Sequence, residues 1–406
     1  MNTPTTTTTI SDNARGTGTP GTTRGSTTGT NTGTSRRTFL HVTALAAAGL
    51  TAAGLVPGVS AMMRKDDREA VKKMRVLVLG GTGFLGPAIV EHALERGHEV
   101  TLFNRGRTRP ELFAHLEQLR GDRDGDLEAL KGRQWDVVID TSGYVPRIVH
   151  DSATLLADQV RQYIFISSVS VYASNAEPNA DEEAPVGTLD DPKVEEVTGA
   201  TFGPLKALCE QAAEAAMPGR VSNIRPGLIV GKRDGSDRFT YWPVRIDRGG
   251  DVLSPGDGSD PVQLIDVMDL GRWIVHVAEK NTTGVFNALG PEGGMPMRTL
   301  LEACQDVSDQ ASHLIWVDAA FLDRHGVRAW SDMPAWVPAT GDSRGFGTRS
   351  CARAVAAGLT FRPIHETCAE TLAWFGSLPE ERQKNLRAGI SAEREREVLK
   401  AWNARD

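Results

Sequence analysis

The chain has 406 residues, of which 40% are hydrophobic and 24% charged, a globular composition with room for one large or two medium domains. Its formal net charge of −7 argues against nucleic acid as the main partner, because nucleic-acid binding usually needs a basic surface. The four cysteines are widely spaced and contain no Cys-x-x-Cys pair. We therefore expect buried free thiols, with no metal site and no disulfide framework.

Residues 1–61 have the pattern of a disordered leader and a signal peptide. Residues 1–34 are dominated by Thr, Gly, Ser and Asn, which bury too little apolar surface to become ordered. Arg36 and Arg37 then precede a mildly apolar run that ends in small residues, which resembles a twin-arginine signal. We expect export to the periplasm or the medium, with membrane contact only through this signal. An uncleaved anchor is the alternative, but the run is short for a span.

From Met74 the sequence alternates between strand-like and helix-like segments. Strand-like runs begin near residues 74 and 98 and recur at 135–143, 162–172 and 220–231; helix-like segments lie near 126–131 and 147–158. Such alternation indicates βαβ units and a parallel sheet. We predict an α/β fold, a Rossmann-type doubly wound parallel sheet over residues 74–231.

After residue 232 the alternation becomes irregular, with loops rich in Gly, Pro and Asp. Helical patterns are present at 268–280, 297–307 and within 348–375. We predict a smaller α+β substrate-binding region over 232–375, inserted among and following the last sheet strands. Residues 376–406 are expected to form a charged helical tail with a solvated face.

The segment GGTGFLG lies between the first strand-like run and a helical pattern. Gly80, Gly83 and Gly86 permit a tight turn and close approach of the backbone to a pyrophosphate, with Phe84 and Leu85 in the same turn. The following helix offers free N–H groups to an anion. This context predicts a dinucleotide site. The alternative is a turn that packs helix on strand without a ligand.

The second strand-like run ends at Asn104, where an NAD site normally has an acidic residue for the ribose hydroxyls. Asn104 does not repel a 2′-phosphate, and Arg105 and Arg107 can bind one, so NADP is favoured over NAD. The alternative is that both arginines point into solvent. Asp122 is expected to contact the adenine amine. Two residues are expected beside the ribose and nicotinamide: Thr141 and Ser142.

These features together resemble the extended short-chain dehydrogenase/reductase family of NAD(P)-dependent sugar epimerases, dehydratases and reductases. The resemblance covers about residues 74–375 and rests on the motifs GGTGFLG, GD at 121–122, SSVSVY, FGPLK, RPGLIVG and VQLIDVMDL. It implies a catalytic Ser/Thr–Tyr–Lys set. Ser168 and Lys206 match the serine and lysine, Lys206 also bonding the cofactor ribose, and Phe202 has the position of the tyrosine.

In the family mechanism the tyrosine moves a substrate proton and the lysine charge lowers its pKa. Phe202 cannot move a proton, and general acid/base catalysis is typically worth ~10²–10⁴ in rate. Tyr172 is a candidate substitute acid, and Tyr144 and Thr201 are further candidates. We expect Phe202→Tyr to raise hydride transfer; no gain would indicate that another acid is present.

The family's substrate pocket is lined by the segment after the sixth strand, which implies that Arg225 shapes the pocket wall. Tyr241 and Trp242 are expected to stack on a substrate ring, with core packing as the alternative. Arg233, Arg238 and Arg245 are the candidate cations for an anionic substrate, although a neutral one fits the sequence equally well.

The sequence predicts an exported NAD(P)-dependent oxidoreductase or epimerase, acting on a hydroxyl or carbonyl carbon of a sugar-like or other small polar substrate. Free nicotinamide cofactor should be scarce outside the membrane, so we expect a tightly bound cofactor recycled within one turnover. The alternative is a catalytically silent NAD(P)-binding module for a ligand or partner. The resemblance also implies a homodimer.

Overall fold

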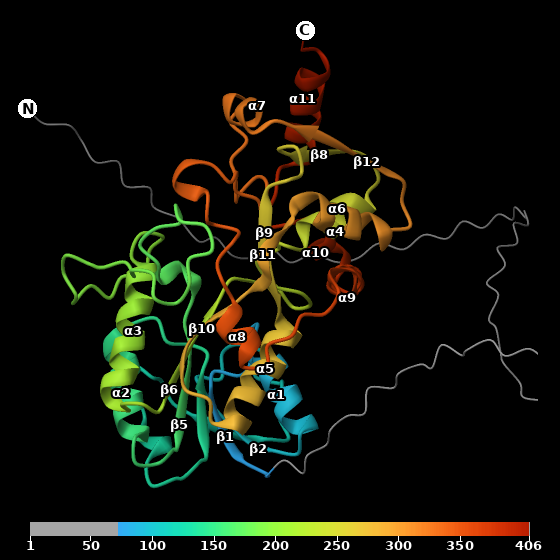
Figure 1. The fold of residues 1–406 in the computed structure, drawn as a ribbon. Coiled ribbons are helices and arrows are strands. Elements are labelled where there is room, and N and C mark those ends of the chain that lie inside the picture. Colours follow the sequence, from blue (N-terminus) through green and yellow to red (C-terminus); the bar gives the residue numbers. More distant parts are fainter. Residues whose placement is uncertain (1–71, 406) are drawn as a thin grey trace, which may run out of the picture. The chain divides into compact units, whose positions relative to one another are not determined.

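A sheet of seven parallel strands forms the centre of the computed structural model, which describes residues 72–405 (Figure 1). The signal peptide predicted within residues 1–61 lies outside the described residues. The strands of the sheet are β1 (Arg75–Leu79), β2 (Glu99–Asn104), β3 (Glu117–Arg120), β4 (Val137–Asp140), β5 (Gln162–Ile166), β6 (Val221–Pro226) and β10 (Gly284–Ala288).

The strand order in this sheet is β10-β6-β5-β4-β1-β2-β3. Each neighbouring pair is parallel. The order reverses direction between β1 and β4, and doubly wound sheets bind their ligands outside the carboxyl ends of the strands at such a switch point. The predicted Rossmann-type fold is confirmed.

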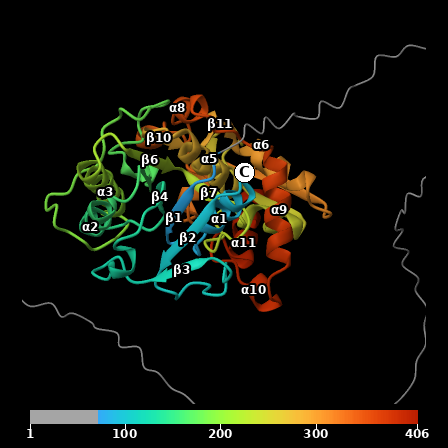
Figure 2. The same cartoon turned by 90° about the horizontal axis from the view of Figure 1, so that it is seen from below.

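Helices cover both faces of the sheet, and the sequence alternates accordingly. α1 (Gly86–Glu95) packs beside α5 (Val267–Lys280) on one face, and α2 (Pro146–Leu156) beside α3 (Phe202–Ala216) on the other (Figures 1 and 2). Within β1, Val76 and Val78 face the α1 and α5 side, whereas Leu77 and Leu79 face the α2 and α3 side. Because both faces of the sheet are buried, the sequence of β1 is a continuous apolar run.

A second group of elements builds its own hydrophobic core. Its strands form a three-stranded sheet of β11 (Gly290–Pro296), β9 (Pro261–Asp266) and β7 (Leu228–Val230), and a two-stranded sheet of β12 (Ser312–Val317) and β8 (Gly250–Pro255). Its helices are α4 (Tyr241–Asp247), α6 (Met297–Asp306), α7 (Ala319–Arg324), α9 (Ile364–Gly376), α10 (Glu380–Lys384) and α11 (Ala392–Asn403). The remaining helical elements are α8 (Ala352–Ala356) and the 3-10 helices η1 (Glu128–Leu130), η2 (Val169–Val171) and η3 (Gly341–Ser343).

The predicted boundary between residues 231 and 232 requires correction. β10 pairs with β6 at the edge of the seven-stranded sheet, and α5 packs on α1, so the chain returns to the first core after residue 231. Gly271 of α5 shows how close this packing is, because an added Cβ would lie 2.8 Å from Ala88. The second region is therefore inserted between sheet elements, as its irregular pattern indicated, and also follows them.

The charged tail predicted at 376–406 is helical, but it is not fully solvated. Val398 and Leu399 of α11 belong to the second core. Glu395 is 3% exposed, accepts a 3.0 Å hydrogen bond from Leu253 N and pairs with Arg245 at 2.6 Å. One face of α11 therefore closes the second core. Within residues 72–405, none of the helices has the length and apolar character needed to cross a membrane.

Candidate active site

A cavity of about 1290 Å³ opens at the carboxyl ends of the central strands. Its lining combines the loops after β1, β2, β3, β4 and β5 with the start of α3 and with segments of the second region. Among the predicted cofactor and catalytic residues, these line it: Gly80, Gly83, Phe84, Leu85, Gly86, Asn104, Arg105, Asp122, Thr141, Ser142, Ser168, Tyr172, Phe202 and Lys206. The fold thus brings side chains from distant parts of the sequence to one place.

The glycine-rich loop has the geometry of an anion-binding turn. Gly80 has φ +108°, and an added Cβ would lie 2.4 Å from Thr141 Oγ1. An added Cβ on Gly86 would lie 2.4 Å from the backbone of Gly81, so this glycine lets α1 start against the loop. Gly83 has no atom within 4 Å of its Cβ position, which leaves open space over the turn. The loop therefore fits a pyrophosphate at the start of α1.

The end of β2 presents an amide and several cations. Asn104 Oδ1 accepts hydrogen bonds from Gly106 N at 2.8 Å and from Arg120. These bonds fix the amide, and its buried Nδ2 has no partner among the described residues. An orphaned donor at this position fits a ribose hydroxyl or a phosphate oxygen. Arg105 and Arg107 line the cavity and are exposed. Arg120, which donates to Asn104, is a third cation beside this end of β2, and it was not predicted from the sequence.

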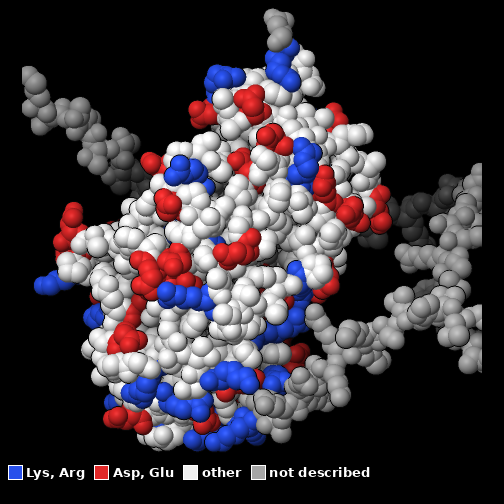
Figure 3. Space-filling view, viewed as in Figure 1, with Lys and Arg blue, Asp and Glu red and all other residues white. Residues whose placement is uncertain are grey.

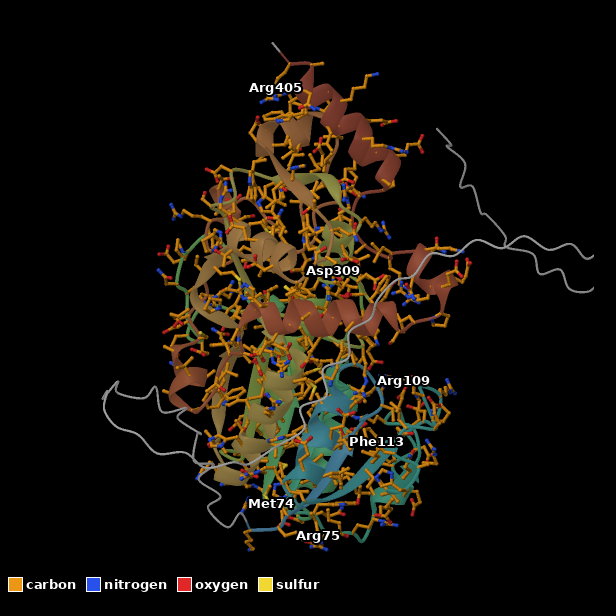
Figure 4. All side chains as sticks on the ribbon, turned by 90° about the vertical axis from the view of Figure 1, so that its right-hand side faces the viewer. Met74, Arg75, Arg109, Phe113, Asp309 and Arg405 are labelled. Atoms are coloured by element: carbon orange, nitrogen blue, oxygen red, sulfur yellow. The ribbon has the colours of Figure 1, made fainter. Side chains whose placement is uncertain are left out.

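Arg109 is a further residue that the sequence analysis missed. Its Nη2 donates to the carbonyl oxygen of Gly83, and its φ is +41°. In Figure 4, Met74 and Arg75 lie where β1 begins, and Arg109 lies toward the opposite end of the strands. Arg109 thus ties the segment after β2 to the glycine-rich loop. No sequence signal distinguished it from its neighbours, since three arginines occur between 105 and 109.

The loops after β3 and β4 lie next to the glycine-rich loop. Asp122 forms a backbone bridge with Asp126 and stays half-buried at the cavity. Thr141 Oγ1 donates to Leu79 O at 3.0 Å, and Ser142 N donates to Asp140 Oδ1 at 3.0 Å. The Thr141 bond joins the end of β4 to the end of β1 across the switch point, and the Ser142 bond stays within the end of β4. Thr141 and Ser142 therefore lie at the cavity, and their contact with the ribose and nicotinamide stays a prediction.

Lys206 lies on the first turns of α3 and is 3% exposed. Its Nζ donates to Gly143 O at 2.7 Å and to Ile166 O at 2.5 Å, and lies 4.4 Å from the centre of the Phe165 ring. Burial lowers the pKa of Lys206 to about 8. The ammonium is thus fixed between the ends of β4 and β5, beside Tyr144, whose ring centre is 5.1 Å away.

Phe202 is the first residue of α3, and its ring packs against Tyr144 with centroids 6.3 Å apart. Tyr144 is 47% exposed and lines the cavity. Burial of part of its ring, with the nearby Asp140 charge, raises the pKa of Tyr144. A phenol is therefore present beside Lys206, although it comes from the loop after β4 rather than from α3.

Two neighbouring serines follow β5 at the cavity. Ser168 caps η2, accepting from Ser170 N at 3.1 Å and donating to Ser170 Oγ at 3.1 Å. Ser167 is 6% exposed and its hydroxyl has no partner among the described residues. Ser168 was predicted from the sequence and Ser167 was not, although the two serines are adjacent. Both hydroxyls are available to a ligand in the cavity, since Ser168 makes only local bonds.

Tyr172 lines the cavity with its ring, but its hydroxyl is engaged elsewhere. The hydroxyl donates to Asn287 Oδ1 at 2.6 Å and accepts from Arg225 Nη1 at 2.9 Å. Burial raises the pKa of Tyr172. This placement argues against Tyr172 as the substitute acid. The Thr201 hydroxyl is also occupied, because it donates a hydrogen bond to Glu196 O at 2.6 Å.

The predicted substrate contacts of Arg225, Tyr241 and Trp242 require correction, because none of the three lines the cavity. Arg225 is 5% exposed and forms a two-bond ion pair with Glu210, at 2.9 and 2.7 Å. Tyr241 and Trp242 belong to the second core, and Trp242 Nε1 donates to Pro334 O. Most residues of α4 are buried, so Tyr241 and Trp242 pack in the core, which was the alternative. Of the three arginines proposed as cations for an anionic substrate, Arg233, Arg238 and Arg245, it is Arg238 that lines the cavity.

The described residues, 72–405, contain no group of three or more His, Cys, Asp and Glu side chains that could hold a metal ion. The geometry instead fits a dinucleotide: an open glycine-rich turn, an orphaned Asn104 donor and a buried Lys206 ammonium. The fold and this cavity together define a nucleotide-binding protein of the doubly wound α/β class.

The model of the NAD-dependent epimerase/dehydratase family matches residues 76–288, and the chain belongs to this family. The resemblance to extended short-chain dehydrogenases and the expectation of an NAD(P)-dependent oxidoreductase or epimerase are thereby confirmed. The match covers the central sheet through β10, so it includes the returning strand that the predicted boundary had left out.

Individual proteins of known sequence or structure are similar to this chain. The human epimerase family protein SDR39U1 is 29% identical over 239 residues, 54% of this chain and 75% of that protein. The 41 kDa chloroplast stem-loop binding protein b of Arabidopsis thaliana is 28% identical over 255 residues, 58% of this chain and 63% of that protein. The UDP-glucuronic acid 4-epimerase of Bacillus cereus, solved with NAD, is 15% identical and matches in fold with a TM-score of 0.56, covering 76% of this chain and 98% of that chain.

Proposed function

We propose that the protein is an NADP-preferring oxidoreductase or epimerase acting on a hydroxyl or carbonyl carbon of a sugar-like or other small polar substrate. The observation that supports it best is the placement of Lys206. Its buried ammonium lies between the ends of β4 and β5, in the cavity that also contains the glycine-rich loop and Ser168. A bound nicotinamide dinucleotide would supply the acceptor or donor of hydride. Lys206 would hold its ribose, and Ser168 would orient the substrate oxygen.

The preference for NADP is supported by the charges at the end of β2. Asn104, Arg105 and Arg107 line the cavity there, and Arg120 donates to Asn104. Guanidinium groups bind phosphate by charge-assisted hydrogen bonds. The carboxylates in the lining, Asp122 and Asp124, follow β3 rather than β2.

Tyr144 is our proposal for the residue that moves the substrate proton. Its ring lies beside the Phe202 ring and over the Lys206 ammonium. A phenol is protonated at neutral pH, so Tyr144 can donate a proton to a substrate oxygen. Phe202 then keeps the position of the family tyrosine as an apolar wall that supports Tyr144.

Single-turnover hydride transfer tests this assignment, with a substrate found by screening nicotinamide absorbance. Tyr144→Phe should slow the reaction by ~10²–10⁴, while Phe202→Tyr should change the wild-type rate little. In the double variant the new Tyr at 202 should restore part of the loss. A Tyr144→Phe variant with full activity would remove Tyr144 from the mechanism. No absorbance change in any variant would favour a silent binding module.

We further propose that the protein is exported with its cofactor already bound, as the Arg36-Arg37 motif indicates. A compartment poor in free dinucleotide favours a cofactor that is recycled within one turnover, as in epimerisation. Native mass spectrometry of protein purified from the periplasm should detect a bound dinucleotide. Protein recovered there without one would contradict the retained cofactor, and protein found only in the cytoplasm would contradict export.

A further inference from the structure

Two cysteines of the second core lie in contact although they are 64 residues apart in sequence. Cys304 in α6 and Cys368 in α9 have their Sγ atoms 3.5 Å from each other, and both side chains are 0% exposed. The helices α6 and α9 pack on each other, which brings the two thiols together (Figure 1). Of the other cysteines, Cys209 lies in the first core and Cys351 donates to Glu292 Oε2 at 3.0 Å. The contact between Cys304 and Cys368 makes them a redox pair by geometry.

The distance between these two sulfurs is short enough for a bond to form by side-chain movement. A disulfide has its sulfurs ~2.05 Å apart, so the two Sγ atoms must approach each other by about 1.5 Å. Each cysteine lies inside a helix, Cys304 within Met297–Asp306 and Cys368 within Ile364–Gly376, and the helices fix both backbones. Folding has therefore already removed the chain entropy that opposes closing this long loop.

The start of α9 is also fixed to the first core. Thr367, the residue before Cys368, is 2% exposed, and its hydroxyl donates to Asp266 Oδ2 at 2.7 Å. Asp266 is the N-cap of α5, where its Oδ1 accepts from Met268 N at 2.7 Å. These bonds leave Cys368 little freedom to move away from Cys304.

The native chain shields both thiols from an oxidant. Burial, with the neighbouring Cys368, raises the pKa of Cys304 well above its usual range. The thiolate is the nucleophile in thiol–disulfide exchange, so the reaction needs a local opening of the contact between α6 and α9. The pair therefore stays reduced in a reducing compartment, where disulfides rarely persist, and oxidises slowly in an oxidising one.

Going beyond the proposed function, we infer that Cys304 and Cys368 form a disulfide when the folded chain meets an oxidising compartment, with an organic disulfide as the oxidant. One cysteine thiolate attacks a sulfur of the incoming disulfide, which gives a mixed disulfide and releases the first thiol. The other cysteine then attacks its neighbour's sulfur, which closes the Cys304–Cys368 bond and releases the second thiol. The pair loses two protons and two electrons, and the organic disulfide gains both.

The bond closes the segment 304–368 into a loop that contains part of the cavity wall. These residues of the cavity lining lie within the loop: Trp330, Ala335, Val337, Ser343, Phe346 and Arg349. A cross-link across a long loop restricts the unfolded chain and so stabilises the folded one. The oxidised chain therefore gains stability in the region that lines the cavity, after its fold is complete.

Equilibration of the full-length chain in glutathione redox buffers, started from both the reduced and the oxidised chain, tests the pair. The count of free thiols should fall from four to two, because one bond consumes two thiols, and peptide mass spectrometry should find Cys304 linked to Cys368. The bond should be on the order of a hundredfold more favourable in the folded chain than in the urea-unfolded chain, because folding holds the sulfurs together. An equal or smaller preference in the folded chain, or a different linkage, overturns the inference.

Variants assign the bond to this pair. Cys304→Ala and Cys368→Ala should each keep the three remaining thiols of the four free, and their urea midpoints should not change on oxidation. Cys209→Ala is the matched control, because it removes another fully buried thiol; it should form the bond, and its urea midpoint should rise on oxidation as that of the wild type does. A midpoint that rises equally in Cys368→Ala overturns the inference. If an alanine variant fails to fold, the linkage found in the wild type still decides.

These measurements are independent of the proposed function, because they require neither a substrate nor a dinucleotide. A chain that forms the bond but transfers no hydride refutes only the oxidoreductase. A chain that transfers hydride but forms no bond refutes only the redox pair.

Discussion

The buried ammonium of Lys206 affects two properties of the protein, folding stability and cofactor binding. These two properties change in opposite directions as the pH rises. Burial lowers the pKa of Lys206 from 10.5 to about 8. Between these values the unfolded chain holds a proton that the folded chain has lost, so this residue makes stability rise with pH from about 8 to 10.5. Over the same range the folded protein loses the ammonium that we assign to the cofactor ribose.

We therefore expect NADPH affinity to fall as the pH passes about 8, while the cofactor-free chain gains stability. Fluorescence titration and urea denaturation at matched pH values measure the two effects. The Lys206→Met variant should show neither the fall in NADPH affinity nor the rise in stability. The difference between this variant and the wild type therefore gives the contribution of Lys206. An NADPH affinity that stays constant up to pH 10.5 would contradict the assigned role.

Asn104 determines the cofactor preference in our proposal. Asn104→Asp should weaken NADPH binding by about tenfold, because a carboxylate repels the 2′-phosphate. It should leave NADH binding unchanged or stronger, because a carboxylate accepts both ribose hydroxyls. Equilibrium titration with both nucleotides checks this, with Arg133→Gln as a control that removes one charge outside the cavity. Equal loss of both affinities would point to a folding defect instead.

Among single residues, the ones predicted best are those whose role depends on local geometry. Gly80 and Gly86 are required by a turn, and Lys206 by its place on the first turns of α3. Arg225 and Tyr172 could not be placed in the same way. Arg225 depends on Glu210, 15 residues away on the preceding helix, and Tyr172 on Asn287, 115 residues away; both pairs meet only in the folded chain.

At the scale of elements, α11 shows how a charged sequence can still close a core. Its composition indicated a solvated helix, yet it buries Val398, Leu399 and the carboxylate of Glu395. Charged residues are rarely buried unless paired, and Glu395 is paired with Arg245 of α4. A partner about 150 residues away in sequence leaves no local signal.

Glu395→Gln should therefore destabilise the protein by about 3 kcal/mol, because it leaves the Arg245 charge without its partner in a poorly solvated position. The control is Glu397→Gln on the same helix, whose pair with Arg394 is about half exposed and should be worth less than ~1 kcal/mol. Urea midpoints at unchanged m-value report both changes. Equal effects of the two variants would show that α11 contributes little through Glu395.

At the scale of the whole molecule, all four cysteines are fully buried free thiols, although they belong to different elements. The Sγ atoms of Cys304 in α6 and Cys368 in α9 are 3.5 Å apart, farther than the ~2.05 Å of a disulfide bond. Burial raises the pKa of Cys209 and Cys351 to about 12. Both thiols are therefore protonated and unreactive at neutral pH.

A thiol reagent such as 5,5′-dithiobis(2-nitrobenzoate) should thus react with the native chain only as it unfolds, and with four thiols per chain in denaturant. Absorbance at a fixed reagent concentration gives both the rate and the count. Rapid reaction without denaturant would contradict the burial of these side chains. A count of two in protein recovered from the periplasm would show that one pair is oxidised after export.

The charge of the molecule is spread rather than segregated. On the face drawn in Figure 3, Lys and Arg side chains are interspersed with Asp and Glu, and no continuous field of one sign covers it. The net charge of −7 therefore says little about the cavity. Arg238 and Arg349 line the cavity of a chain that is acidic overall, and only the folded structure brings them together.

Three features were predictable from the amino-acid sequence: the alternation of strands and helices, the glycine-rich turn and the position of Lys206. These follow from short-range rules: the periodicity of apolar residues, the φ angles that glycine permits and the spacing along one helix. The return of β10 and α5 to the first sheet is seen only in the folded chain. The same holds for the position of Tyr144 over Lys206 and for the burial of Arg349 without a carboxylate. Contacts between residues far apart in sequence have no period or spacing to reveal them, because they exist only when the two cores have formed.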